Sequence, residues 1–204
     1  MLTETTGRTP QDLATELAVL RDADWASVWA GPPMPEPELR EWCGRYGWEP
    51  LTFDRQLVVR GRSGGELTLS SNGQWSPVSS VRYDAWDVRA GEAADNGTVL
   101  SSADEAWPGY LDAAVSALGA PVWAGSWDAE DFPEPPTPAF WRGRESRLSK
   151  RSPYRLAYWA PRSADGAAFV LDQSVSFPTW TQDLPGGSMI CLTARAAAEV
   201  VRTG

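Results

Sequence analysis

The spacing of apolar and polar positions changes several times along the chain, and each change marks a predicted element. Thr9 and Pro10 supply an N-cap and a proline at the first helical position. Three leucines then recur at helical spacing: Leu13, Leu17 and Leu20. The pattern predicts a first helix that ends near Asp22.

A second helix is predicted in the segment ELREWCGRYGW, which follows Pro35-Glu36-Pro37. Its apolar residues fall on one face of a helix: Leu39, Trp42, Cys43 and Tyr46. Gly47 suits the C-terminal cap, because glycine tolerates the left-handed backbone found there. Cys43 is therefore expected to be a buried thiol and not a nucleophile.

Residues 55–88 switch to the period of two that is typical of strands. RQLVVRG and ELTLS flank the turn RSGG and are predicted to form a hairpin. QWSPVSSVRYDAWDV continues as a long third strand, which Pro77 would break or bulge.

The segment GEAADNG is predicted to be a loop, and Ser102 and Glu105 have the spacing of a capping box. Because proline disrupts a helix interior, Pro108 suggests that the regular helix begins nearer Trp107. Gly119 is expected to end this helix.

In the last third of the chain, apolar and polar residues alternate again. ESRLSK, YRLAYWAP and AAFVLDQSVSF are predicted strands, followed by a last strand, SMICLT. A short helix, ARAAAEVVR, with Thr193 as its N-cap, is expected to close the chain.

This succession predicts a single α+β domain in which antiparallel strands pack with helices, because strict βαβ alternation is absent. Two αβββ halves are the suggested organisation, covering residues 35–100 and 101–204. Residues 1–34 are then an N-terminal helical extension of an α+β domain that spans 35–204.

Composition excludes most enzyme chemistry. The 204 residues include no histidine, which removes Ser-His-Asp and Cys-His systems and nearly all transition-metal centres. Cys43 and Cys191 are the only cysteines, and neither belongs to a C-x-x-C pair. Phosphate-binding and dinucleotide-binding motifs are also missing. We therefore expect a non-catalytic protein without cofactor or metal.

Localisation and charge narrow the choice of partner. No run of about 18 apolar residues is present and the N-terminus lacks the features of a secretion signal, so a cytoplasmic protein without a membrane segment is expected. Residues 83–134 carry 11 acidic residues and one basic residue, a net charge of −10 within a chain of −9 overall. Such a field repels nucleic acid and attracts a basic partner.

The candidate binding site is the stretch from Gly119 to Trp141, which combines aromatic and acidic side chains. Its proposed contact residues are Trp123, Trp127, Asp128, Glu130, Asp131, Glu134 and Trp141. Nearby prolines favour an extended, partly rigid loop, and aromatic residues beside charges are typical of interface hot spots. The alternatives are a solvated connector whose tryptophans fold back onto the core, a carbohydrate site, or the paired carboxylates of a glycoside hydrolase.

The following stretch, WRGRESRLSKRSPYRLAYWAPR, interleaves arginines with aromatic residues. Such a pattern can bind single-stranded nucleic acid. The simpler interpretation is that these arginines point outward from a hairpin and pair with the acidic segment before it.

Two motifs carry a resemblance. YLDAAVSALGAPVWAG with the later Trp141, and ELREWCGRYGW, resemble segments of small actinobacterial proteins of unknown function that are found beside polymorphic toxins. The resemblance covers about residues 35–185. It implies an immunity-like protein in bacterial competition, a cytoplasmic, non-catalytic inhibitor of a cognate toxin domain. No functional residue can be carried over from that group.

These observations together predict an immunity protein that docks an acidic, Trp-rich face on a basic toxin domain, such as a nuclease. A carbohydrate-binding or carbohydrate-active protein that uses the same tryptophans and carboxylates is the alternative.

Overall fold

The computed structural model describes residues 2–4, 7–34, 36–53, 56–71, 76–176 and 183–197, with only the backbone described for 2–4. One antiparallel sheet contains β1 (Leu2–Glu4), β2 (Glu49–Phe53), β3 (Leu57–Arg60), β4 (Glu66–Ser71), β5 (Val78–Ala90), β6 (Trp123–Ser126), β7 (Arg155–Trp159), β8 (Ala167–Val175) and β9 (Gly187–Ala196). The helices are α1 (Pro10–Arg21), α2 (Trp25–Ala30), α3 (Glu36–Arg45), α4 (Asn96–Leu118) and α5 (Arg144–Lys150), with a short 3-10 turn, Ala93–Asp95.

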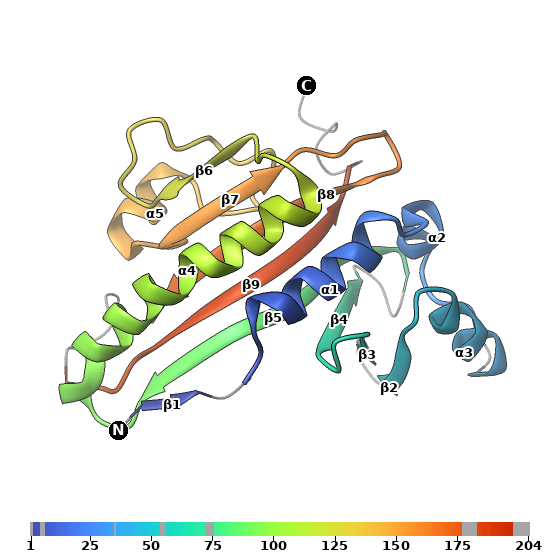
Figure 1. The fold of residues 1–204 in the computed structure, drawn as a ribbon. Helices are drawn as coiled ribbons and strands as arrows, with labels where there is room; N and C mark the ends of the chain where they lie inside the picture. Colours follow the sequence, from blue (N-terminus) through green and yellow to red (C-terminus); the bar gives the residue numbers. More distant parts are fainter. Residues whose placement is uncertain are drawn as a thin grey trace.

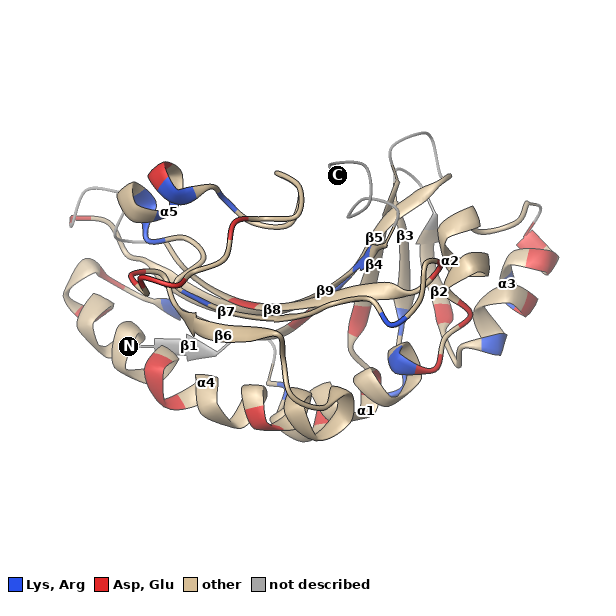
Figure 2. Cartoon of the chain, turned by 90° about the horizontal axis from the view of Figure 1, so that it is seen from above, with Lys and Arg blue, Asp and Glu red and all other residues tan. Residues whose placement is uncertain are grey.

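The strand order is β2-β3-β4-β5-β9-β8-β7-β6, and β1 pairs with the C-terminal end of β5. The first four strands and the last four therefore form two meanders that meet where β5 pairs with β9. Helices α1 and α4 cover one face of the sheet, and α5 lies on the other (Figures 1 and 2). The chain is thus a single-domain α+β protein, as predicted, with four strands in each half and not three.

Helix α1 forms as the sequence predicts. Thr9 and Asp12 make a reciprocal capping box, and Pro10 occupies the first helical position. The three leucines of its inner face are buried: Leu13, Leu17 and Leu20. These side chains belong to the main hydrophobic cluster, and α1 lies beside α4 in the helical layer, so this N-terminal helix is part of the core (Figure 1).

Helix α3 and the β3–β4 hairpin also confirm their predictions. Gly47 has φ +70°, the left-handed conformation expected after α3. Cys43 is fully buried, and burial raises the pKa of its thiol to about 11, which suits a core residue. Strand β2 and helix α2 were not predicted. Helix α2 follows an Asp24 N-cap and stacks Trp25 on Trp29 at 4.6 Å.

The start of α4 corrects the sequence prediction. The helix begins at Asn96 and runs for 23 residues, so Ser102 and Glu105 lie within it and form no capping box. The helix continues through Pro108, and side chains from the sheet bind the turn before it. Gln173 donates to the Ala103 carbonyl at 2.7 Å, and Arg155 pairs with Asp104 at 2.6 Å. Gly119, with φ +87°, ends the helix as expected.

Two further predictions need correction. ESRLSK lies in α5 and is not a strand. The last strand, β9, extends to Ala196, so Thr193 lies inside it and caps no helix. The remainder of the predicted C-terminal helix, residues 198–202, lies outside the described residues, as do Gln74 and Trp75 of the predicted third strand. That strand, β5, begins directly after Pro77.

No helix in the described part of the chain is long and apolar enough to span a membrane.

A buried carboxylate ties α1 to the β3–β4 turn. Glu16 is fully buried, and its Oε1 accepts a hydrogen bond from the Ser63 backbone N–H at 2.5 Å. The Ser63 hydroxyl lies 3.2 Å from the Tyr83 hydroxyl, and the Arg8 guanidinium stacks over the Tyr83 ring at 5.1 Å. This network fixes the turn against the helical layer.

We expect Glu16→Ala to lower the free energy of unfolding by about 1–3 kcal/mol, because the Ser63 N–H loses its acceptor inside the protein. Glu16→Gln keeps an acceptor oxygen and should cost less. Urea unfolding of both variants measures the difference. Glu105→Ala, on the exposed side of α4, is the control and should change stability by no more than about 0.5 kcal/mol. An equal loss in the Ala and Gln variants would contradict this role.

Candidate functional site

The candidate site is the acidic loop, defined here as residues 127–143, which joins β6 to α5 on the face of the sheet opposite α1 and α4 (Figure 2). Three aromatic residues of the loop, Phe132, Phe140 and Trp141, are buried in a second hydrophobic cluster. The sheet side of this cluster comprises Leu156, Tyr158, Ala168 and Val170. The loop therefore has a small core of its own, which holds it in one conformation.

The three tryptophans of the predicted site have different environments. Trp141 is only 6% exposed, and its indole N–H donates to the Pro133 carbonyl at 3.0 Å. Trp123 is half-buried against the Phe132 ring, and its N–H donates to Asp131 at 3.2 Å. Trp127 is half-buried beneath the Arg151 guanidinium, 5.2 Å from the ring centre. Trp141 is thus an anchor of the loop, and only Trp123 and Trp127 retain exposed surface.

The four predicted carboxylates are all exposed: Asp128, Glu130, Asp131 and Glu134. None of them forms an ion pair with any described residue. The Ser126 hydroxyl donates to Asp128 at 2.6 Å, and this bond lowers the pKa of the Asp128 carboxyl. The structure therefore brings these acids together on one anchored loop.

The arginines that follow the loop make contacts that the sequence did not predict. Arg147 is buried in α5, donates to the Trp127 carbonyl and stacks over the Phe132 ring at 4.1 Å. Arg151, the residue after α5, covers Trp127. These two cations thus support the backbone and rings that display the acidic residues, and Arg147 also interacts electrostatically with Asp128 and Glu134.

A second polar cluster lies on the same face of the sheet, where β5, β9 and β8 are adjacent. Arg82 bonds to Asp84 at 2.7 Å and donates to the Cys191 sulfur at 2.8 Å. Asp172 is the register partner of Cys191. Burial raises the pKa of the Asp172 carboxyl to about 6, although the positive charges of Arg82 and Arg195 act to lower it. Burial likewise raises the pKa of the Cys191 thiol, which makes it a poor nucleophile.

Sequence reasoning missed this cluster, although one signal was present. Asp172 and Gln173 interrupt an otherwise apolar strand, and polar residues within such a run usually have specific partners. The partners come from β5 and β9, which only the strand order brings beside β8.

Neither cluster forms a metal site: among the described residues, no group of three or more acidic or cysteine side chains could hold a metal ion. The sequence matches no protein-family model, and comparisons with curated proteins and with solved structures found no match. Functional assignment consequently depends on the residues and geometry of this chain.

Trp141→Ala should lower the free energy of unfolding by about 3–5 kcal/mol, because it removes a large side chain from a packed cluster. Trp127→Ala should cost markedly less, since that ring is half-buried. Thermal or urea unfolding of the two variants measures the difference. Similar costs for both would show that Trp141 does not anchor the loop.

Asp172 should make stability depend on pH. A carboxyl whose pKa is higher in the folded state favours folding at low pH, and that contribution is lost as pH rises through about 6. Asp172→Asn should therefore gain stability relative to the wild type between pH 4.5 and 7.5, by about 1–2 kcal/mol for a half-buried group. Urea unfolding at both pH values measures this, with the exposed Asp112→Asn as control. A pH-independent difference would contradict the prediction.

Proposed function

We propose that the protein is a non-catalytic cytoplasmic binding protein that neutralises a basic toxin domain, as an immunity protein does, by docking its acidic loop on the toxin. The observation that carries this proposal is the set of four exposed carboxylates on an anchored loop, without ion-pair partners among the described residues. An anchored loop loses little conformational entropy on binding. Exposed carboxylates can accept charge-assisted hydrogen bonds from arginine or lysine.

The distribution of charge supports a basic partner. The exposed carboxylates of the acidic loop accelerate encounter with a positive surface, and nuclease domains need positive surfaces to hold phosphate groups. The proposal that the basic partner is a toxin rests on the resemblance of the YLDAAVSALGAPVWAG and ELREWCGRYGW segments to proteins found beside polymorphic toxins.

The residue types of the chain support a binding protein more than an enzyme. The chain has no histidine, and burial raises the pKa of both cysteine thiols. The exposed carboxylates face solvent without the enclosed, apolar surroundings that raise the pKa of a catalytic acid.

The same geometry gives less support to carbohydrate binding. Stacking on a sugar needs an open indole face, whereas Trp141 is buried, Trp123 packs on Phe132, and Arg151 lies over Trp127. The three rings thus form no shared platform.

Charge reversal at Asp128, Glu130 and Asp131 to lysine should slow association with a basic partner by about tenfold or more, and should weaken the dependence of the association rate on salt. Trp127→Ala should mainly speed dissociation. Biolayer interferometry against basic domains encoded beside this chain's gene measures both rates, and rescue of growth in cells that express the domain measures neutralisation.

The matched control reverses Glu105 and Asp112, which lie on α4 across the sheet from the loop. Equal effects of the control and the loop variants on the association rate would show that the loop is not part of the interface. Saturable quenching of tryptophan fluorescence by a glycan, without any protein partner, would instead favour the carbohydrate alternative.

A further inference from the structure

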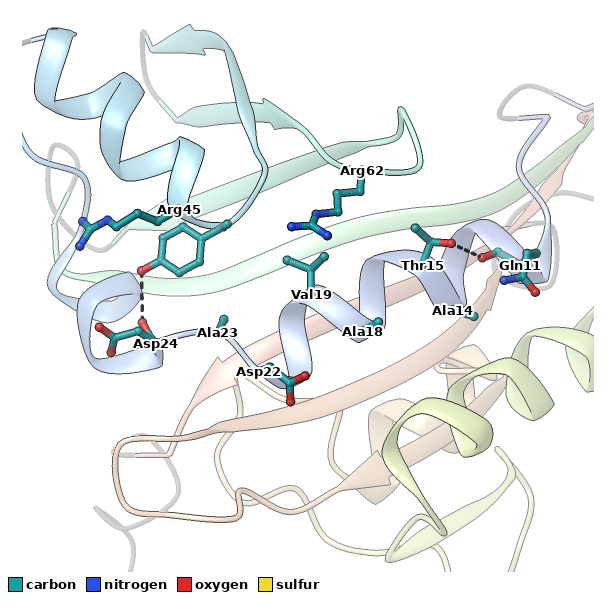
Figure 3. A pocket seen from close by; sticks show the side chains of 11 residues that line it. Gln11, Ala14, Thr15, Ala18, Val19, Asp22, Ala23, Asp24, Arg45 and Arg62 are labelled. Carbon is teal, nitrogen blue, oxygen red and sulfur yellow. Dashed lines mark hydrogen bonds between the residues drawn. The ribbon is translucent and has the colours of Figure 1, made fainter.

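A groove runs along the outer flank of α1, on the side of the sheet opposite the acidic loop (Figures 2 and 3). Its volume is about 720 Å³. One wall is α1 with the turn that follows it, and the other is the end of α3 with the β3–β4 turn. Most of the α1 wall consists of short side chains: Ala14, Thr15, Ala18, Val19 and Ala23.

The charges that line the groove differ in what they already bind. Asp22 forms an ion pair with Arg21 at 2.7 Å, and Asp24 caps α2 by accepting the Ser27 N–H at 3.2 Å. Arg45 and Arg62 are exposed, and neither forms a hydrogen bond or ion pair with a described residue. The groove therefore offers two free guanidinium groups, while its carboxylates are engaged.

Both arginines come from well-fixed backbone. Arg62 belongs to the turn that Glu16 holds through Ser63, and its side chain crosses Gly47, where a Cβ would lie 2.6 Å from the Arg62 Nε. Arg45 is the last residue of α3, and the adjacent Tyr46 hydroxyl donates to the Asp24 carbonyl at 3.4 Å. Figure 3 shows Arg62 pointing toward Val19, whereas Arg45 lies at the far end of the groove and its guanidinium points away from Arg62.

We propose that this groove binds an extended acidic segment of a partner protein, whose carboxylates pair with Arg45 and Arg62. Guanidinium groups bind carboxylates through two parallel hydrogen bonds, which gives the pair both energy and direction. The wall from Gln11 to Asp22 spans about 16 Å at 1.5 Å per residue, the length of about five extended residues. A short peptide therefore uses the whole groove, and its small side chains can contact the alanine-rich α1 wall.

The acidic loop does not prevent this binding. It lies across the sheet from the groove, and its field is screened over distances beyond about 8 Å at physiological salt. Nucleic acid is the less suitable anion, because long-range repulsion by a chain of net charge −9 acts on its many phosphates. The groove is thus a second interaction surface, independent of the proposed neutralising function.

The test uses the full chain and a fluorescein-labelled peptide of about ten residues in which glutamate alternates with alanine and valine. Fluorescence anisotropy at about 0.15 M salt should show saturable binding in the micromolar range. The same peptide with glutamine in place of glutamate should bind at least about tenfold more weakly.

Variants assign the binding to the groove. The double variant Arg45→Gln, Arg62→Gln should weaken binding by at least about tenfold, and Arg62→Lys by less, because lysine keeps the charge but not the paired hydrogen bonds. Arg89→Gln is the control: it removes an arginine that is 74% exposed and lies outside the groove, and it should leave binding unchanged. Thermal unfolding checks that each variant is folded.

Any one of three results would overturn the proposal. The glutamate peptide would show no saturable binding, the glutamate and glutamine peptides would bind equally well, or the double variant would bind as tightly as the wild type. Tighter binding of a single-stranded DNA of equal charge, lost in the double variant, would assign the groove to nucleic acid. Self-association of the chain that depends on Arg45 and Arg62, seen by sedimentation velocity, would assign it to a second copy.

Discussion

The pairing of β5 with β9 is the interaction on which the rest of the structure depends, because it joins two four-stranded meanders into one sheet. The ladder runs from the pair Ser80–Arg195 to the pair Arg89–Gly187, and a bulge after Asp84 bends it. Helix α4 lies across both meanders, with contacts to β5, β8 and β9. Without this ladder the helices would have no continuous surface to cover, and the apolar inner edge of each meander would be exposed to water. The hydrophobic core is consequently shared between the halves, which makes the chain one domain.

The sheet also separates two surfaces of different character. On the side of α1 and α4 it carries most of the core, and the groove with Arg45 and Arg62 opens at the margin of that layer. On the other side a smaller cluster anchors the acidic loop, whose carboxylates face solvent. The two proposed binding surfaces, the groove and the acidic loop, therefore lie on opposite faces of the sheet and do not overlap.

Tryptophan content illustrates why composition alone is an ambiguous guide to function. Seven tryptophans in the described part of the chain are buried: Trp25, Trp42, Trp48, Trp86, Trp107, Trp141 and Trp159. A buried indole contributes a large apolar area and needs only one hydrogen-bond acceptor, so it serves a core as readily as an interface. Trp159, for example, donates to the Gly119 carbonyl at 2.8 Å, which ties β7 to the end of α4. The side chains near the acidic loop that are still exposed enough to contact a partner are its four carboxylates and the half-buried rings of Trp123 and Trp127.

The sequence by itself determined the α+β class, helices α1 and α3, the β3–β4 hairpin and the end of α4, because these depend on local signals: an N-cap followed by proline, a single period of apolar residues, or a glycine at a helix end. It also identified the acidic residues that the loop displays. Only the tertiary structure decided that α4 continues through Pro108, and the side chains that contact the turn before it, Gln173 and Arg155, come from distant strands. Short elements such as α2, β2, β6 and α5 likewise depend on packing. The burial of Trp141 and the placing of Arg45 and Arg62 along one groove were decided in the same way, because burial and proximity follow from how elements pack and not from local sequence.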